Sequence, residues 1–253
     1  MANVFPRWSN LLPIKLAVFL VFAGIGVVCG VTYYFTGKYT RVGYMPDQPV
    51  AFDHSIHVGQ LGLDCRYCHS YVEESLFSNV PATQTCYNCH SQIKKDSPKL
   101  APVHESIETN EAINWVRIHQ VPDYAYFNHA VHIARGVSCR SCHGQVNEME
   151  VVYEAQPLTM GWCLDCHRGP EEHLRPADEV TNLDWKPADE NRAAFYHELA
   201  EVSGGSYDEL LATAKERFGF KDLESAMTQR EIGTALVDVL GVNPPQSCTA
   251  CHR

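Results

Sequence analysis

A five-residue pattern, Cys-x-x-Cys-His, occurs five times in the chain and restricts the fold more than any other feature of the sequence. On one turn of helix, two thiols three residues apart can both reach the vinyl edge of a porphyrin, and the histidine that follows can bind its iron. Ten of the eleven cysteines belong to the pattern. We therefore predict five covalently attached haem c groups, held by Cys65, Cys68, Cys86, Cys89, Cys139, Cys142, Cys163, Cys166, Cys248 and Cys251.

Zinc ribbons are the alternative interpretation, because cysteine pairs with this spacing also bind zinc. A zinc site, however, does not need a histidine directly after each second cysteine. With 13 histidines among 253 residues, chance would rarely add a histidine to all five pairs. The pattern therefore favours haem over zinc, and also over disulfides.

The histidines outnumber the positions that five haems need. Each haem takes a proximal histidine from its own motif, and two H-x-x-H pairs provide four distal ligands, because histidines three residues apart share one face of a helix. His119 provides a fifth. The predicted iron ligands are His69, His90, His143, His167 and His252 on the proximal side, and His54, His57, His119, His129 and His132 on the distal side.

The distal ligand of the last haem is left open by the sequence. His173, His197, Met149 and Met160 are alternatives to His119. A methionine ligand would give a haem of higher potential than a second histidine would. Each of the four also has an ordinary interpretation, as a surface histidine or a packing methionine.

Irons with two protein ligands have no free position for a substrate. Multihaem enzymes such as nitrite reductases keep one open position, often with a lysine in place of the motif histidine, and no Cys-x-x-Cys-Lys occurs here. The sequence therefore predicts an electron carrier without catalytic residues, which is not an enzyme on its own.

The first four motifs form two similar units. The pattern F-x-H-x-x-H at Phe52–His57 recurs 75 residues later, at Phe127–His132, and each copy is followed by two haem motifs. Residues 52–90 and 127–167 are therefore interpreted as a duplicated two-haem unit.

This duplication predicts the domain organisation. Between residues 188 and 240, the sequences Ser-Tyr-Asp-Glu and Thr-Gln-Arg-Glu fit capping boxes and predict two or three surface helices. The fold class is mainly α and irregular, with a core built largely by the haems. The four predicted parts are an N-terminal anchor with its flanks (1–41), a first two-haem unit with a connecting helix (42–121), a second two-haem unit (122–175), and a helical insert with the fifth haem site (176–253).

Nineteen residues without a charge, Leu16–Tyr34, predict one transmembrane helix. At about 1.5 Å per residue they span about 28 Å, close to the hydrocarbon thickness of a bilayer. A cleaved signal peptide would have a shorter apolar run and an A-x-A-like site after it, and neither is present. Small residues at Gly26 and Gly30 suit close approach of another helix, although they are equally compatible with none.

The flanking charges barely decide the orientation of this span. Arg7 and Lys15 precede it, and Lys38 and Arg41 follow it. Haem attachment to such motifs takes place outside the bacterial cytoplasm. We therefore predict a protein of the bacterial inner membrane whose residues after the span lie on the periplasmic side.

The net charge of −10 argues against a nucleic-acid partner. An acidic surface steers basic patches of partner proteins toward it, although a solvated surface without a partner is an alternative.

Several longer segments resemble one family more specifically. The single span, five motifs and duplicated pairs are similar to the pentahaem cytochrome subunit of bacterial alternative complex III. The resemblance extends to the segments at 96–100, 115–119, 122–129 and 158–163, and to Pro244-Pro245 before the last motif. It implies a subunit that works with an iron–sulfur subunit and polytopic membrane subunits in quinol oxidation. Electrons would pass from iron–sulfur clusters to the haems, and then to a monohaem cytochrome c or a terminal oxidase.

The H-x-x-H layout also resembles the class III (cytochrome c3-like) group. In such small multihaem cytochromes the first histidine of a pair usually binds the haem attached just downstream, and the second reaches another haem. We expect the same tendency in this chain.

Two other functions remain to be distinguished. A free-standing, membrane-anchored quinol dehydrogenase would also have one span, but four haems and no such insert, and it would be active alone. A haem enzyme would have a high-spin iron that binds nitrite.

Overall fold

The computed structural model describes residues 6–35 and 41–252, so that Lys38, predicted to follow the span, lies outside the described residues. The chain divides into two compact units, Met1–Val42 and Gly43–Arg253, and each is described by itself.

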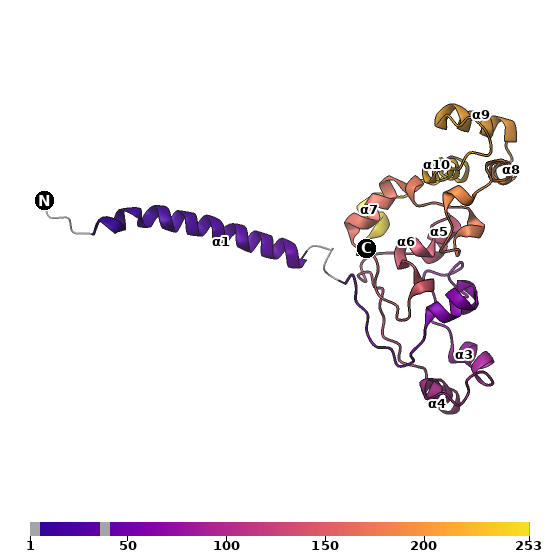
Figure 1. Cartoon of the computed structure of the whole chain (residues 1–253), viewed down its shortest axis with the longest axis horizontal. Helices are drawn as coiled ribbons and strands as arrows, with labels where there is room; N and C mark the ends of the chain where they lie inside the picture. The colour runs from indigo at the N-terminus through magenta and orange to yellow at the C-terminus, as the bar shows by residue number, and fades with distance from the viewer. Residues whose placement is uncertain (1–5, 36–40, 253) are drawn as a thin grey trace. The chain divides into compact units, whose positions relative to one another are not determined.

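Helices and irregular segments make up the described residues (Figure 1). The described part contains isolated bridges, Ala125 to His252 and Val137 to Leu174, but no named strand. The predicted mainly helical and irregular fold class is thus confirmed. The α-helices are α1 (Leu12–Phe35), α2 (Cys65–Cys68), α3 (Thr83–His90), α4 (Ala101–Thr109), α5 (His129–Ala134), α6 (Cys139–His143), α7 (Met160–Arg168), α8 (Arg192–Ser203), α9 (Tyr207–Phe218), α10 (Gln229–Leu240) and α11 (Cys248–Cys251). Short helical segments cover Arg7–Leu11, Ser55–Gln60, Pro98–Leu100, Val146–Glu148, Pro170–Glu172, Ala177–Glu179 and Pro187–Asp189.

The first unit is dominated by α1, which contains the predicted span Leu16–Tyr34. Its 24 residues correspond to about 36 Å of helix. No residue of α1 is buried within the protein, unlike the core helix of a soluble domain. Together with Trp8–Leu11, α1 is long and apolar enough to cross a membrane.

Most of the five motifs begin at the start of a helical turn. Asp64 precedes α2, and its carboxylate accepts a hydrogen bond from the backbone N–H of Arg66. Ser138 precedes α6 and caps it in the same way through Arg140. Such capping residues satisfy the free N–H groups of a first turn. These two caps hold the cysteine pairs of the first and third motifs on one turn, which is the geometry that attachment to a porphyrin edge needs.

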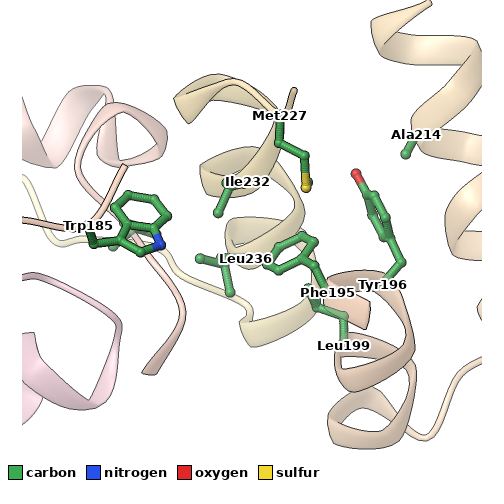
Figure 2. Packing of buried hydrophobic residues seen from close by; sticks show 9 residues of the cluster. Trp185, Phe195, Tyr196, Leu199, Ala214, Met227, Ile232 and Leu236 are labelled. Carbon is green, nitrogen blue, oxygen red and sulfur yellow. The ribbon is translucent and has the colours of Figure 1, made fainter. Parts of the chain in front are cut away.

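In the described part of the second unit, the continuous apolar core is formed by residues between 174 and 236. It consists of Leu174, Trp185, Phe195, Tyr196, Leu199, Ala214, Met227, Ile232 and Leu236. Figure 2 shows the side chains of α8 and α10 pointing toward one another, with Trp185 on one side and Ala214 on the other. The described residues around the first four motifs contribute isolated buried side chains such as Val50, Val72 and Val103 instead. This contrast agrees with the expectation that haem replaces protein packing there.

A buried ion pair joins α8 to α10. Arg192 and Glu231 are each 2% exposed, and the guanidinium donates to both carboxylate oxygens, at 2.7 and 2.9 Å. Arg192 also donates to the carbonyl of Ser225 and lies 4.1 Å from the ring centre of Phe220. The predicted surface helices are therefore a packed subdomain with a core of its own.

The subdomain is fastened to the segment after the fourth motif. Gly233 of α10 lies against the backbone of Glu171 so closely that any β-carbon there would overlap it. Gln229, on the same helix, donates to the carbonyls of Glu171 and Leu174. Gly233 is thus required by a close backbone approach rather than by a turn.

Candidate functional site

The two H-x-x-H segments have nearly the same geometry. His57 stacks on Phe52 with ring centres 4.4 Å apart, and His132 stacks on Phe127 at 4.6 Å. The first histidine of each pair meets the same phenylalanine edge-on, at 4.7 Å in both units. One phenylalanine therefore fixes the orientation of both imidazoles in each copy.

Backbone carbonyls fix the second histidine of each pair further. Nδ1 of His57 lies 2.7 Å from the carbonyl oxygen of Asp53, and Nδ1 of His132 lies 2.7 Å from that of Asn128. An imidazole that donates through Nδ1–H is in the tautomer whose Nε2 carries the free lone pair. Nε2 is thus the atom available to a metal in both copies.

Three histidine pairs have the separation that an iron between them requires. Imidazole nitrogen binds a first-row metal at about 2.0 Å and the ring centre lies about 1.2 Å beyond, so two imidazoles on one iron have centres about 6.3 Å apart. The structure separates His57 from His90 by 6.1 Å, His132 from His167 by 6.2 Å, and His129 from His143 by 6.5 Å. These residues fit haem iron with two axial histidines.

Three proximal histidines are held by carbonyls outside their own helices. Nδ1 of His69 faces the carbonyl oxygen of Asn79 at 2.7 Å, His90 that of Ile93 at 2.9 Å, and His167 that of Pro245 at 2.7 Å. Sequence analysis missed these contacts. Any residue type can supply a carbonyl, so the sequence carries no signal for them.

Several predicted ligands gather around His143, which is half-buried. Burial, with His119 and His129 nearby, lowers the pKa of His143 to about 3. Burial likewise lowers the pKa of His54 to about 4, with His69 as the next cause. Both imidazoles are therefore neutral at pH 7, which is the form that binds metal. The ring of His119 lies 4.3 Å from that of His143, so it is close to the third motif.

The first three motifs are neighbours through their cysteines. Burial raises the pKa of Cys68, and the nearby thiols of Cys86 and Cys89 raise it further. The second motif therefore lies next to the first. The thiol of Cys139 lies close to that of Cys65 and lowers the pKa of Cys65 to about 7, which brings the first motif next to the third.

The row continues to the last motif. Burial, together with the nearby thiols of Cys166 and Cys163, raises the pKa of Cys142 to about 12. The third motif therefore lies next to the fourth. Burial, together with the nearby thiol of Cys251, raises the pKa of Cys163. The fourth motif therefore lies next to the fifth motif. The order in space is second, first, third, fourth, fifth. None of the ten motif cysteines is paired in a disulfide.

His104 is buried more than its sequence suggests. Glu105, Glu108 and Glu111 lie close to it in the sequence, a pattern typical of an exposed helical surface. In the structure α4 packs on α3, and the ring of His104 lies 5.7 Å from that of Tyr87 in the second motif. The buried Nε2 of His104 has no hydrogen-bond partner. The neighbouring Val103, which is fully buried, is the sequence signal that this helix faces inward.

The four reserve ligands lie in different surroundings. His197 is exposed and faces Glu201 at 3.8 Å, and His173 is exposed after the turn Pro170–Glu172. Met149 is 5% exposed and packs close to Gly144, whereas Met160 is 65% exposed at the start of α7. Only Met160 of these four lies in a haem-motif helix.

In the described residues, no group of three or more His, Cys, Asp or Glu is placed to hold a metal ion without a porphyrin. Zinc in a cysteine site usually takes four protein ligands.

Comparisons with known proteins agree with the haem-binding geometry. Residues 37–120 match the model of the class III cytochrome C family, and residues 125–190 match that of cytochrome c7 and related cytochrome c. The multiheme cytochrome c subunit of menaquinone reductase from Nitratidesulfovibrio vulgaris is 30% identical over 149 residues, which cover 51% of this chain and 70% of that protein. Both family models end before α8, so the helical subdomain lies outside them.

Proposed function

The chain belongs to the multihaem c-type cytochromes, the family of that menaquinone reductase subunit, and from this we propose that it is a membrane-anchored, periplasmic pentahaem electron-transfer subunit of a quinol-oxidising complex of the alternative complex III type. The observation that carries the proposal is the unbroken row of five adjacent motifs. Each bound haem supplies a reversible one-electron change at its iron.

The role of the polypeptide is to hold the haems in place and to fill both axial positions of their irons with histidine. Phe52 and Phe127 orient the paired imidazoles, and the carbonyls of Asp53 and Asn128 select the tautomer that leaves Nε2 free. An iron with two histidines cannot bind a substrate, which favours electron transfer over catalysis. The chain is thus a carrier that depends on partner subunits for chemistry.

The charge distribution supports docking of a soluble or membrane acceptor on the acidic helical subdomain. Within residues 170–240, acidic residues outnumber basic ones by 16 to 7, and this difference accounts for nearly all of the net charge of −10. Such a surface speeds the approach of basic partners. A monohaem cytochrome c or the docking face of a terminal oxidase fits this description.

A menaquinone-reducing complex is the second candidate, favoured by the identity to the relative described above. Electrons would then pass in the opposite direction, from a soluble donor through the haems to menaquinone. The chain's residues would have the same roles in both cases.

Purification from native membranes distinguishes these functions. We expect the chain to co-purify with polytopic and iron–sulfur subunits, and the complex to reduce cytochrome c when given a quinol. Menaquinone reduction by a reduced cytochrome, without the quinol activity, would favour the second candidate. A chain that is active with quinol alone would favour the free-standing quinol dehydrogenase instead.

Replacing His132 with alanine tests the ligand assignment. His132 lies 6.2 Å from His167, so its loss is expected to convert one haem to the high-spin state without loss of haem attachment. Electron paramagnetic resonance and visible spectra of the oxidised protein measure this change. The matched control is His197→Ala on exposed α8, which should leave every haem low-spin. An unchanged low-spin spectrum in His132→Ala would contradict the assignment.

A further inference from the structure

The duplicated H-x-x-H segments differ at the residue that precedes the first histidine. Asp53 occupies this position in the first copy and Asn128 in the second. Oδ1 of Asp53 accepts a hydrogen bond from the N–H of Ile56, three residues on, at 3.3 Å. Oδ1 of Asn128 accepts one from the N–H of Val131 at the same spacing and distance. Because aspartate and asparagine satisfy the first N–H groups of a helical turn about equally well, the negative charge of Asp53 is not required for the local fold.

Ser55 holds the carboxylate of Asp53 at the start of its turn. Its N–H and its hydroxyl donate to Oδ1 of Asp53, at 2.8 and 2.6 Å. In the second copy Ala130 stands at the position of Ser55, and an alanine has no hydroxyl to donate. The first copy therefore fixes a charged group where the second copy has a neutral amide.

Residue 53 is in direct contact with a predicted iron ligand. Nδ1 of His57 lies 2.7 Å from the carbonyl oxygen of Asp53, and the ring centre of His57 lies 6.1 Å from that of His90. In the second copy, His132 makes the same 2.7 Å contact with the carbonyl of residue 128 and lies 6.2 Å from His167. The two histidine pairs thus match in spacing and in the hydrogen bond of the distal imidazole. The negative charge beside that imidazole distinguishes the first copy from the second.

We propose that Asp53 lowers the reduction potential of the haem at the second motif, relative to the haem at the fourth. This inference rests on the proposed function, because it requires haem at both motifs. A carboxylate near an iron stabilises the oxidised, more positive state over the reduced one. Groups in contact with the axial ligands are one of the means by which a protein sets the potential of a metal. Electrons then move downhill from the second motif toward the fourth, which is followed by the segment that holds the helical subdomain.

The test is a redox titration of the full chain within its purified complex, followed by visible spectroscopy. Asp53→Asn removes the charge but keeps the capping oxygen, so one haem step is expected to move to higher potential. Asn128→Asp adds a charge to the second copy, so one step is expected to move to lower potential. Both variants should keep the haem count and the spin states of the native protein. A purely structural effect of the two substitutions would not give shifts of opposite sign.

Removal of single haems assigns the shifts to their motifs. In a chain that lacks the second haem (Cys86→Ala with Cys89→Ala), Asp53→Asn should leave all four remaining steps in place. In a chain that lacks the fourth haem (Cys163→Ala with Cys166→Ala), Asp53→Asn should still move one step to higher potential.

Asn191→Asp is the matched control. Asn191 is exposed and caps α8, where its Oδ1 accepts a hydrogen bond from the N–H of Ala194 at 3.0 Å. The substitution adds the same charge to a helix cap outside the haem motifs, so every step should stay in place. If Asp53→Asn or Asn128→Asp caused no shift, or the shift of Asp53→Asn persisted without the second haem, the tuning role of Asp53 would be overturned, while a haem count of five would leave the proposed function standing. A count other than five would overturn the proposed function itself.

Discussion

A chain in which Cys139 and Cys142 are both replaced by alanine is expected to lose one haem and to transfer electrons slowly between its two ends. In the described part of the chain, the third motif lies next to both the first motif and the fourth, and so lies between the pair formed by the second and first motifs and the pair formed by the fourth and fifth. Its loss leaves a gap in the middle of the row. Haem content by the pyridine haemochrome assay and rapid-mixing reduction of the remaining haems measure the two effects.

The matched comparison removes the last motif instead, through Cys248→Ala and Cys251→Ala. This variant should also lose one haem, but the remaining haems should still be reduced together, because the gap falls at the end of the row. Cys29→Ala in α1 should change neither quantity, since Cys29 is outside the motifs. If both double variants slowed internal electron transfer equally, the order derived from the cysteine contacts would be wrong.

Replacing Glu231 with alanine is expected to destabilise the helical subdomain by about 3–5 kcal/mol, because it leaves the buried guanidinium of Arg192 without its carboxylate. The remaining bonds to backbone carbonyls of the 222–226 segment do not neutralise the charge. Chemical denaturation of the haem-loaded full chain, followed by far-ultraviolet circular dichroism, measures the loss of α8–α10.

An exposed ion pair of the same subdomain is the control. Arg217 and Asp238 are 2.9 Å apart, and both side chains are more than half exposed. Asp238→Ala should therefore cost about 0–1 kcal/mol. Equal effects of Glu231→Ala and Asp238→Ala would contradict the role of the buried pair as the link between α8 and α10.

Local patterns predicted the elements that depend on neighbouring residues. The five motifs lie on helices or helical turns, α1 contains the predicted span, and the duplicated phenylalanines and histidines have matching ring geometry. The helix starts after Ser206 and Thr228 were also correct, although only Thr228 makes the capping hydrogen bond. These features are encoded within a few residues, so a single sequence reveals them.

Contacts between distant segments were not predictable in the same way. Pro245 orients His167 through a carbonyl, which leaves no trace in the identity of residue 245. Arg192 and Glu231 are 39 residues apart, and in sequence each resembles an exposed helical charge. The sequence offers His119 as a distal ligand, which stays a prediction, and its proximity to His143 depends on the folded chain.

The intact mass of the purified full-length protein tests the central claim most directly. The account predicts the mass of the polypeptide plus five covalently bound haems, one for each pair of motif cysteines. A mass with fewer haems, or one that falls to the bare polypeptide after metal chelation, would contradict it.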